Sequence, residues 1–432
     1  MSSFGAFQTS VLGMVSQSHA LGVIGANIAN VTTGGFKRTD AHFQTLLGQT
    51  AASRPAAAAS QSRQSDIAGV TTKDYARISL QGELGNGDGG LDVAIDGPGF
   101  FVFGDNPAGA AAGSGMVYGR DGAFATRLGG PVTTTLPDGR TVSGVESFLS
   151  DAQGRYVLGW PATGAGAPVG GSALGPIRTD PYAFADAPEA TGVVRLGLNL
   201  PSDAVAGSRE SYSIDAFDNS GRLRPIELGF TRTGVNAWAL DAMGAPGDAL
   251  TLGPAPLADL SFSPTGTLLA SAPFSLGIAH PDGGASAFAL DLSAFTQMAG
   301  PLAPLGFERD GHEAGVLDTI DFDADGMVIG TFANGRSRPL YRLALADFAN
   351  PDGLTPQSGN VFAESAASGA AMLGGANEDG FGAIVSGALE RSNVDLSQEF
   401  TQMMVTQKAY NASATAFRTT DEMTTVARDL KE

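Results

Sequence analysis

The chain has 432 residues, enough for two or three domains, and its 60 glycines and charged content of only 16% favour a turn-rich, largely β middle over a helical enzyme. Its formal net charge of −19 excludes binding to nucleic acid or to an anionic membrane surface, because both require a basic face. The absence of cysteine excludes disulfides and thiolate metal sites.

The first stretch of the chain, residues 4–28, predicts a long helix whose apolar positions recur at coiled-coil spacing. Residues 1–36 contain no Lys, Arg, Asp or Glu, so the positively charged region of a secretory signal is missing. Polar side chains such as Gln17 and His19 stop the run short of the roughly 20 apolar residues that a membrane span needs. We expect the helix to lie between other protein helices, with packing on its own domain as the alternative. The predicted seam consists of Phe4, Phe7, Val11, Met14, Leu21 and Ile28.

The segment after this helix is predicted to be irregular. The helix should end near Asn30, and the pair Gly34–Gly35 supplies a stop signal. An irregular arm is expected over residues 38–47. Residues 51–65 are rich in Ala, Ser and Gln, which is typical of an extended linker.

The middle of the chain has the alternation and turn signals of β-strands. Residues 91–95 and 100–103 flank an Asp-Gly-Pro-Gly turn, which predicts a hairpin. A second group of strands is expected over residues 193–262. Residues 287–295 are expected to return to the first β region, and a third group covers residues 316–345.

The last stretch, residues 394–430, predicts a second long helix with an apolar stripe at steps of four and three. The phase of the stripe shifts before Met423. Because neither end helix has a core of its own, we interpret the stripe as a surface that packs on helices of neighbouring copies. Its positions are Leu396, Phe400, Met403, Tyr410 and Phe417.

These elements define a mixed fold class, with a discontinuous coiled-coil-like helical domain made by both chain ends and two mainly β domains nested between them. The predicted parts are residues 1–40 with 385–432 for the terminal domain, 41–70 for a linker or extended arm, 71–148 with 288–365 for the first β domain, 149–287 for an inserted outer β domain, and 366–384 for a connecting segment.

No motif indicates catalysis or a cofactor. Residues 321–326, DFDADG, match the opening of an EF-hand loop, but the twelfth position is Phe332 instead of a bidentate Glu. A strand-turn-strand interpretation fits this run better. The four histidines are scattered and lie beside no motif, and the chain has neither a phosphate-binding loop with Lys nor a Gly-x-Ser-x-Gly elbow. We therefore expect no enzyme activity, no cofactor and no metal.

Three long motifs, in the right order, resemble those of the flagellar rod–hook protein family. They are residues 24–37, IGANIANVTTGGFK, residues 92–101, DVAIDGPGFF, and residues 389–400, LERSNVDLSQEF, which are followed by QKAYNA at 407–412. The chain departs from the family's usual form at Ala26, where the family has Asn. The family-motif residues are Asn27, Asn30, Gly35, Phe36, Gly97, Gly99, Phe100, Phe101, Ser392, Asn393, Val394 and Asp395.

Within this family the large middle insertion resembles hook proteins, since rod proteins are shorter. Further hook-like runs are 217–221, 230–238, 295–297, 330–335 and 344–351. The resemblance implies a subunit that self-assembles into a curved hollow tube, a universal joint that transmits motor torque to the filament. It implies contacts with flagellar rod, hook cap and hook–filament junction proteins and with the flagellar export apparatus. It also implies an extracellular hook attached to the basal body, reached without a cleavable signal and without membrane insertion.

Two alternatives remain open from the sequence. One is a distal rod or hook-associated junction protein of the same family. The other belongs to a different class, a secreted β-rich adhesin whose terminal helices form a stalk.

Overall fold

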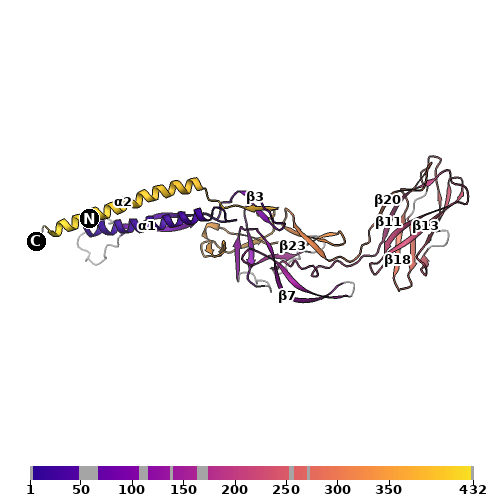
Figure 1. Cartoon of the computed structure of the whole chain (residues 1–432), viewed down its shortest axis with the longest axis horizontal. Coiled ribbons are helices and arrows are strands. Elements are labelled where there is room, and N and C mark those ends of the chain that lie inside the picture. Colours follow the sequence, from indigo (N-terminus) through magenta and orange to yellow (C-terminus); the bar gives the residue numbers. More distant parts are fainter. Residues whose placement is uncertain are drawn as a thin grey trace, which may run out of the picture.

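The chain forms an elongated molecule with a helical arm at one end, a β domain in the middle and a second β domain at the far end (Figure 1). The computed structural model describes residues 3–47, 67–106, 115–136, 140–162, 174–252, 257–269 and 273–429. Both chain ends lie at the tip of the helical arm (Figure 1). The predicted mixed fold with helical ends and a nested β middle is confirmed.

The helical arm consists of α1 (Ser3–Ala29) and α2 (Leu396–Asp429), which lie side by side. A hairpin of β1 (Thr39–Leu47) and β2 (Ile67–Ala76) packs along α1. The prediction of an irregular arm over residues 38–47 was therefore wrong. Strand β1 alternates too weakly in hydrophobicity to be recognised, and its partner lies some 30 residues further along the chain. The predicted linker at residues 51–65 lies outside the described residues.

Local signals end α1 and begin α2 where the sequence predicts. Helix α1 stops one residue before Asn30, whose side-chain amide donates back to the Ala26 carbonyl at 2.9 Å. Asp395 is the N-cap of α2, because its Oδ1 accepts from the backbone N–H of Ser397 at 2.8 Å and of Gln398 at 3.2 Å. A cap of this kind contributes about 1 kcal/mol to helix stability.

The polar residues of α1 are used in protein contacts. By length and composition alone, Phe7–Ala29 could cross a membrane. The polar side chains of Gln17 and His19, which interrupt its apolar run, predict instead that it packs on protein. In the folded chain His19 Nε2 lies 2.9 Å from Asp74 Oδ1, and the amide of Asn27 exchanges two hydrogen bonds with the backbone of Thr39 at 2.8 and 3.0 Å. These contacts tie α1 to the β1–β2 hairpin.

The inner β domain is built from strands before and after the inserted domain. Its largest sheet runs in the order β21-β22-β23-β9-β5-β6-β26-β25. Aromatic and β-branched side chains from these strands form its core, as expected for buried sheet faces. Its elements are β3 (Leu84–Asn86), β4 (Val93–Asp96), β5 (Phe100–Gly104), β6 (Met116–Gly119), β7 (Ala125–Thr135), β8 (Thr141–Ser150), β9 (Tyr156–Pro161), β10 (Gly175–Pro176), β21 (Leu317–Phe322), β22 (Met327–Phe332), β23 (Ser337–Leu343), β24 (Leu345–Asp347), the 3₁₀ turn Pro351–Gly353, β25 (Thr355–Gln357), β26 (Val361–Ala363), β27 (Met372–Gly374), β28 (Ala383–Ser386) and β29 (Ala388–Glu390).

The Asp-Gly-Pro-Gly turn does not make the predicted hairpin. Strand β4 pairs with β28, whereas β5 pairs with β6, β9 and β24. The turn moves the chain from one sheet to the other, with Gly97 at φ +114° and Gly99 at φ +124°. A Cβ at Gly97 would lie 3.0 Å from the Cα of Gly382, so the close approach of these two segments requires glycine.

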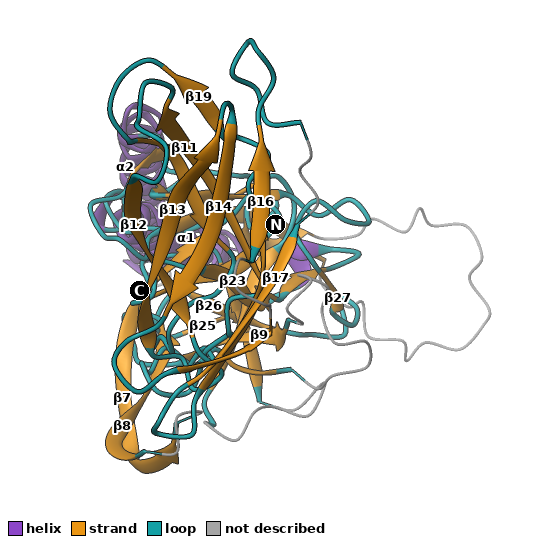
Figure 2. Cartoon of the chain, turned by 90° about the vertical axis from the view of Figure 1, so that its right-hand side faces the viewer, coloured by secondary structure: helices purple, strands orange, loops and turns teal. Residues whose placement is uncertain are grey.

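The outer β domain is a sandwich of two sheets, and it faces the viewer in Figure 2, where strands β13 and β14 are seen along their length. A six-stranded sheet contains β15, β17, β18, β11, β19 and β20, and a four-stranded sheet contains β12, β13, β14 and β16. Trp238, Phe230 and Phe295 fill the space between them. The strands are β11 (Val193–Pro201), β12 (Arg209–Phe217), β13 (Leu223–Gly234), β14 (Ala237–Met243), β15 (Ala249–Leu252), β16 (Ala258–Ser261), β17 (Phe274–Ala279), β18 (Ala285–Asp291), β19 (Thr296–Met298) and β20 (Ala303–Arg309).

The predicted borders of the domains need correction. Strands β9 and β10, placed in the outer domain by the prediction 149–287, pair within the inner sheet. Strand β18, expected to return to the inner domain, pairs with β17 and β11 in the outer one. The predicted connecting segment 366–384 carries β27, and residues 385–390 complete β28 and β29, all within the inner domain. Alternation identifies a strand but does not say which sheet it joins.

The acidic run at residues 321–326 is the turn between β21 and β22, as the strand-turn-strand interpretation predicted. Asp323 Oδ1 accepts from the backbone N–H of Asp325 at 3.0 Å and of Met327 at 2.8 Å. Asp325 Oδ1 accepts from the side-chain amide of Asn377 at 2.8 Å. The carboxylates thus serve to close the turn and attach it to a neighbouring loop.

Candidate assembly surface and the joint that carries it

The seam between α1 and α2 is narrow and largely polar. The buried positions of α2 that face α1 are Glu399 and Thr406, one heptad apart, and Ser413 follows at the next heptad. Gly13 of α1 lies opposite Ser413, where an added Cβ would come within 3.1 Å of the Ser413 Oγ. The two helices therefore approach closely through small and hydroxyl-bearing residues, and most of their large apolar side chains lie elsewhere.

The predicted seam residues divide between this contact and the outside of the arm. In α2, Met403 and Phe417 are half-buried, and Phe417 packs on Phe7 of α1 with ring centroids 4.5 Å apart. Phe4 lies in α1, but its side chain is outside the described residues. The remaining predicted α1 positions, Val11, Met14, Leu21 and Ile28, are half-buried, and the remaining α2 positions, Leu396, Phe400 and Tyr410, are exposed.

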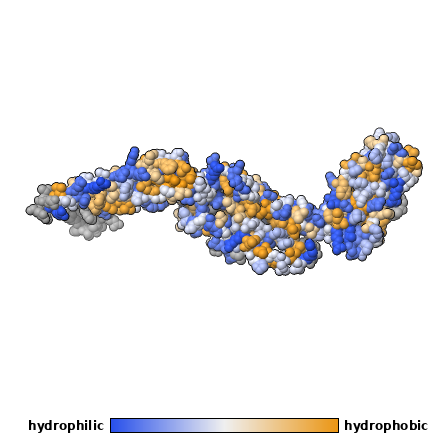
Figure 3. All heavy atoms as spheres, viewed as in Figure 1, coloured by the Kyte–Doolittle hydropathy of each residue, from blue (hydrophilic) through white to orange (hydrophobic). Residues whose placement is uncertain are grey.

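An apolar ridge runs along one side of α2. We define it as Leu396, Phe400 and Met404, which follow each other at steps of four and are 39%, 51% and 57% exposed. Apolar surface gathers on the half of the arm next to the inner β domain, where the ridge begins (Figure 3). Met404 was missed in the sequence, because the seam template stepped by three residues from Phe400 to Met403.

A groove of about 500 Å³ lies on another side of α2, between this helix and the β1–β2 hairpin. Its apolar residues are Phe43, 44% exposed, and Val405, 62% exposed. The lining carries no charged side chain and is completed by Gln17, Ser397, Gln398, Thr401, Gln402, Thr406 and Ala409. Sequence reasoning missed the groove because one of its walls, strand β1, had been predicted as irregular.

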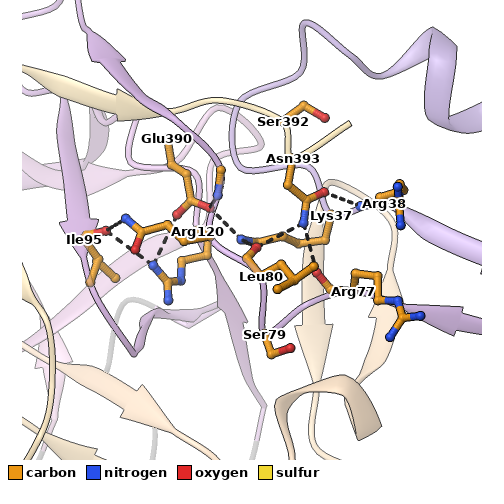
Figure 4. A network of polar contacts seen from close by, with 12 residues as sticks. Lys37, Arg38, Arg77, Ser79, Leu80, Ile95, Arg120, Glu390, Ser392 and Asn393 are labelled. Atoms are coloured by element: carbon orange, nitrogen blue, oxygen red, sulfur yellow. Dashed lines mark hydrogen bonds and ion pairs between the residues drawn. The ribbon is translucent and has the colours of Figure 1, made fainter. Parts of the chain in front are cut away.

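A buried ionic network joins the helical arm to the inner β domain (Figure 4). Glu390, at the end of β29, accepts from Lys37 Nζ at 2.6 Å through Oε1 and from Arg120 Nη1 at 3.2 Å through Oε2. The backbone N–H of Gly82 donates to Oε1 at 2.8 Å. All three charged side chains are at most 5% exposed. Burial lowers the pKa of both Lys37 and Arg120, and Glu390 opposes that effect.

Asn393 closes the same joint through its amide. Its Oδ1 accepts from the backbone N–H of Arg38 at 2.7 Å, and its Nδ2 donates to the carbonyls of Arg77 and Leu80, both at 3.0 Å. Lys37 Nζ donates to the same Leu80 carbonyl at 2.6 Å. One side chain just before α2 thus binds the start of β1 and the end of β2, so the two ends of the chain are held in register (Figure 4).

Gly35 allows the chain after α1 to touch the inner domain. Its φ is +61°, and a Cβ there would lie 2.6 Å from the backbone nitrogen of Asp121. Its own N–H donates to the Glu390 carbonyl at 2.7 Å, and the carbonyl of the following Phe36 accepts from Asn393 N–H at 3.3 Å. The family-motif residues therefore act mainly in this joint.

The other family-motif residues support the joint from both sides. Phe100 and Phe101 are buried in different core clusters of the inner domain, one on each face of β5. Ser392 Oγ accepts from the backbone N–H of Val394 at 3.3 Å, and Val394 is buried beside the N-cap of α2. No simple periodicity pointed to Lys37, Arg120 and Glu390. Lys37 ends the first family motif and Glu390 lies in the third, whereas Arg120 lies in none of the three motifs.

The outer domain contains a Ser–His–Asp arrangement that is sealed from solvent. His280 Nε2 lies 3.0 Å from Ser286 Oγ, and His280 Nδ1 lies 2.9 Å from Asp248 Oδ1. Ser286 is 1% exposed, so no substrate reaches its hydroxyl, and the arrangement serves to connect β15, β17 and β18. Across the described residues, His, Asp and Glu side chains form no group of three suited to a metal ion.

Comparisons with known proteins identify relatives along the whole chain. Residues 385–430 match the family of the flagellar basal body rod FlgEFG protein C-terminal region. Over its full length the chain is 33% identical to the flagellar hook protein FlgE of Rhizobium meliloti (strain 1021), also over that protein's full length. It is 30% identical to FlgE of Escherichia coli (strain K12), over 97% of this chain and 98% of the relative. The crystal structure of Helicobacter pylori FlgE2 matches with a TM-score of 0.44 and 15% identity, over 71% of this chain and 100% of that one.

The chain is thus a structural protein of the bacterial flagellum. It belongs to the flagellar hook protein family, as the resemblance of its three motifs predicted. Membership of the flagellar hook protein family implies that the chain polymerises with itself and that it contributes to motility. The family is structural and is not known as enzymatic.

Proposed function

We propose that this chain builds the hook by packing the apolar ridge of one copy into the groove of the next. The ridge and the groove lie on different sides of α2. Phe400 and Val405 are five residues apart, which places them roughly 140° apart around a helix with 3.6 residues per turn. A copy that presents different surfaces to its two neighbours makes heterologous contacts, and these propagate into rings or open helices. The observation that carries the proposal is the exposure of both surfaces in the single chain.

The resulting polymer would place the helical arms in a packed inner wall and the β domains outside. Coiled-coil contacts resist sliding because knobs from one helix insert into holes of another. The outer domain is joined to the rest by two chain segments only, which lets it move with respect to the inner domain. A stiff wall with mobile outer domains suits a universal joint that transmits torque while it bends.

The partners beyond the chain itself also belong to this proposal. The ends of the polymer would meet flagellar rod, hook cap and hook–filament junction proteins. Export would proceed through the flagellar export apparatus without a cleaved signal. Export without cleavage is supported by the position of α1. Cleavage that removed residues 3–29 would delete one helix of the arm together with its contacts to α2 and to the hairpin.

The proposal is tested by Phe400→Asp in the full chain. The substitution places a charge in the ridge, so the variant should form no tubes in electron microscopy at concentrations where the unmodified chain does, while thermal unfolding of its β domains stays unchanged. The matched control is Leu223→Asp, which charges a comparably exposed apolar residue of the outer domain, 49% against 51%. Tyr410→Asp should act as Phe400→Asp does. Normal tubes from Phe400→Asp would contradict the ridge assignment.

A complementary pair of variants tests the heterologous geometry. Val405→Asp should also block tubes, because it places a charge in the groove. Each variant keeps one intact surface, so an equimolar mixture of Phe400→Asp and Val405→Asp should form a one-to-one dimer by analytical ultracentrifugation, and neither variant should do so alone. Dimers of a single variant would indicate an isologous contact and would contradict the ridge-and-groove pairing.

A further inference from the structure

The two β domains are connected by a ribbon of two antiparallel chain segments, residues 181–191 and 310–317. On the inner side, the Leu317 N–H donates to the Pro181 carbonyl at 3.1 Å. In the middle, Asp186 and Gly315 exchange backbone hydrogen bonds at 2.7 and 3.2 Å. The following pair, Glu189 and His312, exchanges two more at 3.0 Å each, just before the outer domain begins. His312 therefore occupies the last rung of the ribbon at the entrance to the outer domain.

Both ring nitrogens of His312 face hydrogen-bond acceptors. Nδ1 lies 3.0 Å from the backbone carbonyl oxygen of Glu313, and Nε2 lies 3.3 Å from Glu189 Oε2. The side-chain amide nitrogen of Asn334 lies 3.4 Å from Nδ1, and it also donates to Asp186 Oδ2 at 3.1 Å and to the Glu313 carbonyl at 3.0 Å. A neutral imidazole carries one N–H and can satisfy only one of the two acceptors, whereas the imidazolium satisfies both.

The charged groups around the ring belong to both sides of the joint. Asp186 and Glu189 come from the opposite segment of the ribbon, with Asp186 Oδ2 3.8 Å from His312 Nδ1. From the inner domain, Arg336 approaches Asp186 at 4.0 Å and Glu189 at 3.7 Å, and Arg338 approaches Asp186 at 4.0 Å. The ring itself is 12% exposed. The β22–β23 turn thus holds the ribbon through the same two carboxylates that face His312.

We propose that His312 is a proton-controlled latch between the inner and outer β domains. In the imidazolium form it pairs with Asp186 and Glu189 of the opposite segment, and its charge balances these two carboxylates together with the arginines of the inner domain. On loss of the proton both ion pairs are lost, and the ring keeps at most a neutral hydrogen bond across the ribbon. The last rung of the ribbon then opens more easily, so the outer domain samples a wider range of angles. Histidine is suited to this role because its charge changes between about pH 5 and 8.

The latch acts within a single chain and does not depend on the ridge-and-groove contact. It is tested on the full-length monomer by measuring a distance between the two domains. The chain has no cysteine, so Met372→Cys in β27 and Val235→Cys in the β13–β14 turn provide two unique attachment sites for spin labels. In an otherwise unchanged chain, the distribution of distances between the labels should be narrower at about pH 5.5 than at about pH 8.

His312→Gln is the decisive variant, because glutamine keeps a donor and cannot gain a proton. In this variant the width of the distribution should no longer depend on pH. His19→Gln is the control, since His19 pairs with Asp74 in the helical arm and should leave the pH response intact. If the width is the same at both pH values in the unchanged chain, or if the response persists in His312→Gln, the latch is excluded. Circular dichroism of His312→Gln checks that its β domains remain folded.

Discussion

The helical arm and the outer β domain handle apolar residues in opposite ways. The outer domain closes two sheets around Trp238, Phe230 and Phe295, and all three are at most 2% exposed. The arm joins its helices through Glu399, Thr406 and Ser413 and leaves the ridge open. Burial of apolar surface is the dominant favourable term in folding, so the outer domain is stable by itself, whereas the arm gains most of its stabilisation only when neighbours cover it.

This difference shows which part of the chain is built to associate. The largest apolar side chains of the outer domain lie between its two sheets, whereas Phe400 and Met404 of α2 face solvent. The joint between the arm and the inner β domain is stabilised in a third way, by a buried ionic network at Glu390. Three substitutions, one in each region, separate these modes of stabilisation.

The largest effect is expected from Trp238→Ala in the outer domain. Trp238 is fully buried, and its Nε1 has no hydrogen-bond partner among the described residues. The substitution therefore removes packing contacts and buried apolar surface, and no hydrogen bond. The unfolding free energy of this domain should fall by about 4–5 kcal/mol, in the upper part of the range for such truncations. Scanning calorimetry should show a lower melting temperature for the outer domain and an unchanged melting temperature for the inner domain. Val235→Ala, at an exposed turn, is the control, and a shift of both transitions would contradict the independence of the outer domain.

Glu390→Ala should have the next largest effect, on the joint. It leaves Lys37 and Arg120 as buried cations without their carboxylate, which should lower the free energy of unfolding by about 3 kcal/mol or more. Hydrogen exchange should accelerate at β29 and at the start of α2, and tube formation should be impaired although the ridge is intact. Glu422→Ala, at an exposed position of α2, is the matched control. Unchanged exchange at β29 would show that the network does not hold the arm to the inner domain.

The smallest effect, and one that depends on pH, is expected from Glu399→Gln in the seam. Burial raises the pKa of the Glu399 carboxyl, although Asn27 and Arg38 oppose the shift. Because the pKa is higher in the folded chain than in the unfolded chain, proton binding to Glu399 stabilises the fold. This stabilisation is fully present at pH values below the pKa of the unfolded chain, and it is lost as the pH rises through the pKa of the folded chain. Glu399→Gln should therefore melt at a higher temperature than the unchanged chain at neutral pH and at the same temperature near pH 4, measured by circular dichroism at 222 nm. A lower melting temperature at neutral pH would contradict the burial argument.

The sequence predicted the extent of both helices because their signals are local. Asp395 caps α2 and the glycine pair follows α1, and neither signal depends on the rest of the chain. The orientation of α2 was harder to predict. The apolar stripe suggested one seam through Leu396, Phe400 and Met403, but α1 contacts the adjacent face through Glu399 and Thr406. A periodic stripe identifies a face that will be covered and does not identify what covers it.

The borders of the β domains could not be predicted from local alternation. Strand β9 is a short apolar run and β18 alternates, but neither pattern indicates that β9 belongs to the inner sheet and β18 to the outer one. Their assignment depends on pairings between segments hundreds of residues apart, such as β4 with β28. The ion pair of the joint was equally hidden. Lys37 and Glu390 lie in two of the family motifs, but they are 353 positions apart and follow no shared period.

The nested course of the chain also sets the order in which it can fold as it emerges from its N-terminus. The outer domain is contiguous, from β11 at Val193 to β20 at Arg309, so it can close early, since short separations cost the least chain entropy. The inner domain must wait for β28 and β29, which end at Glu390. Helix α2 comes last of all. A truncated chain therefore lacks the ridge, and only a complete subunit can enter the polymer.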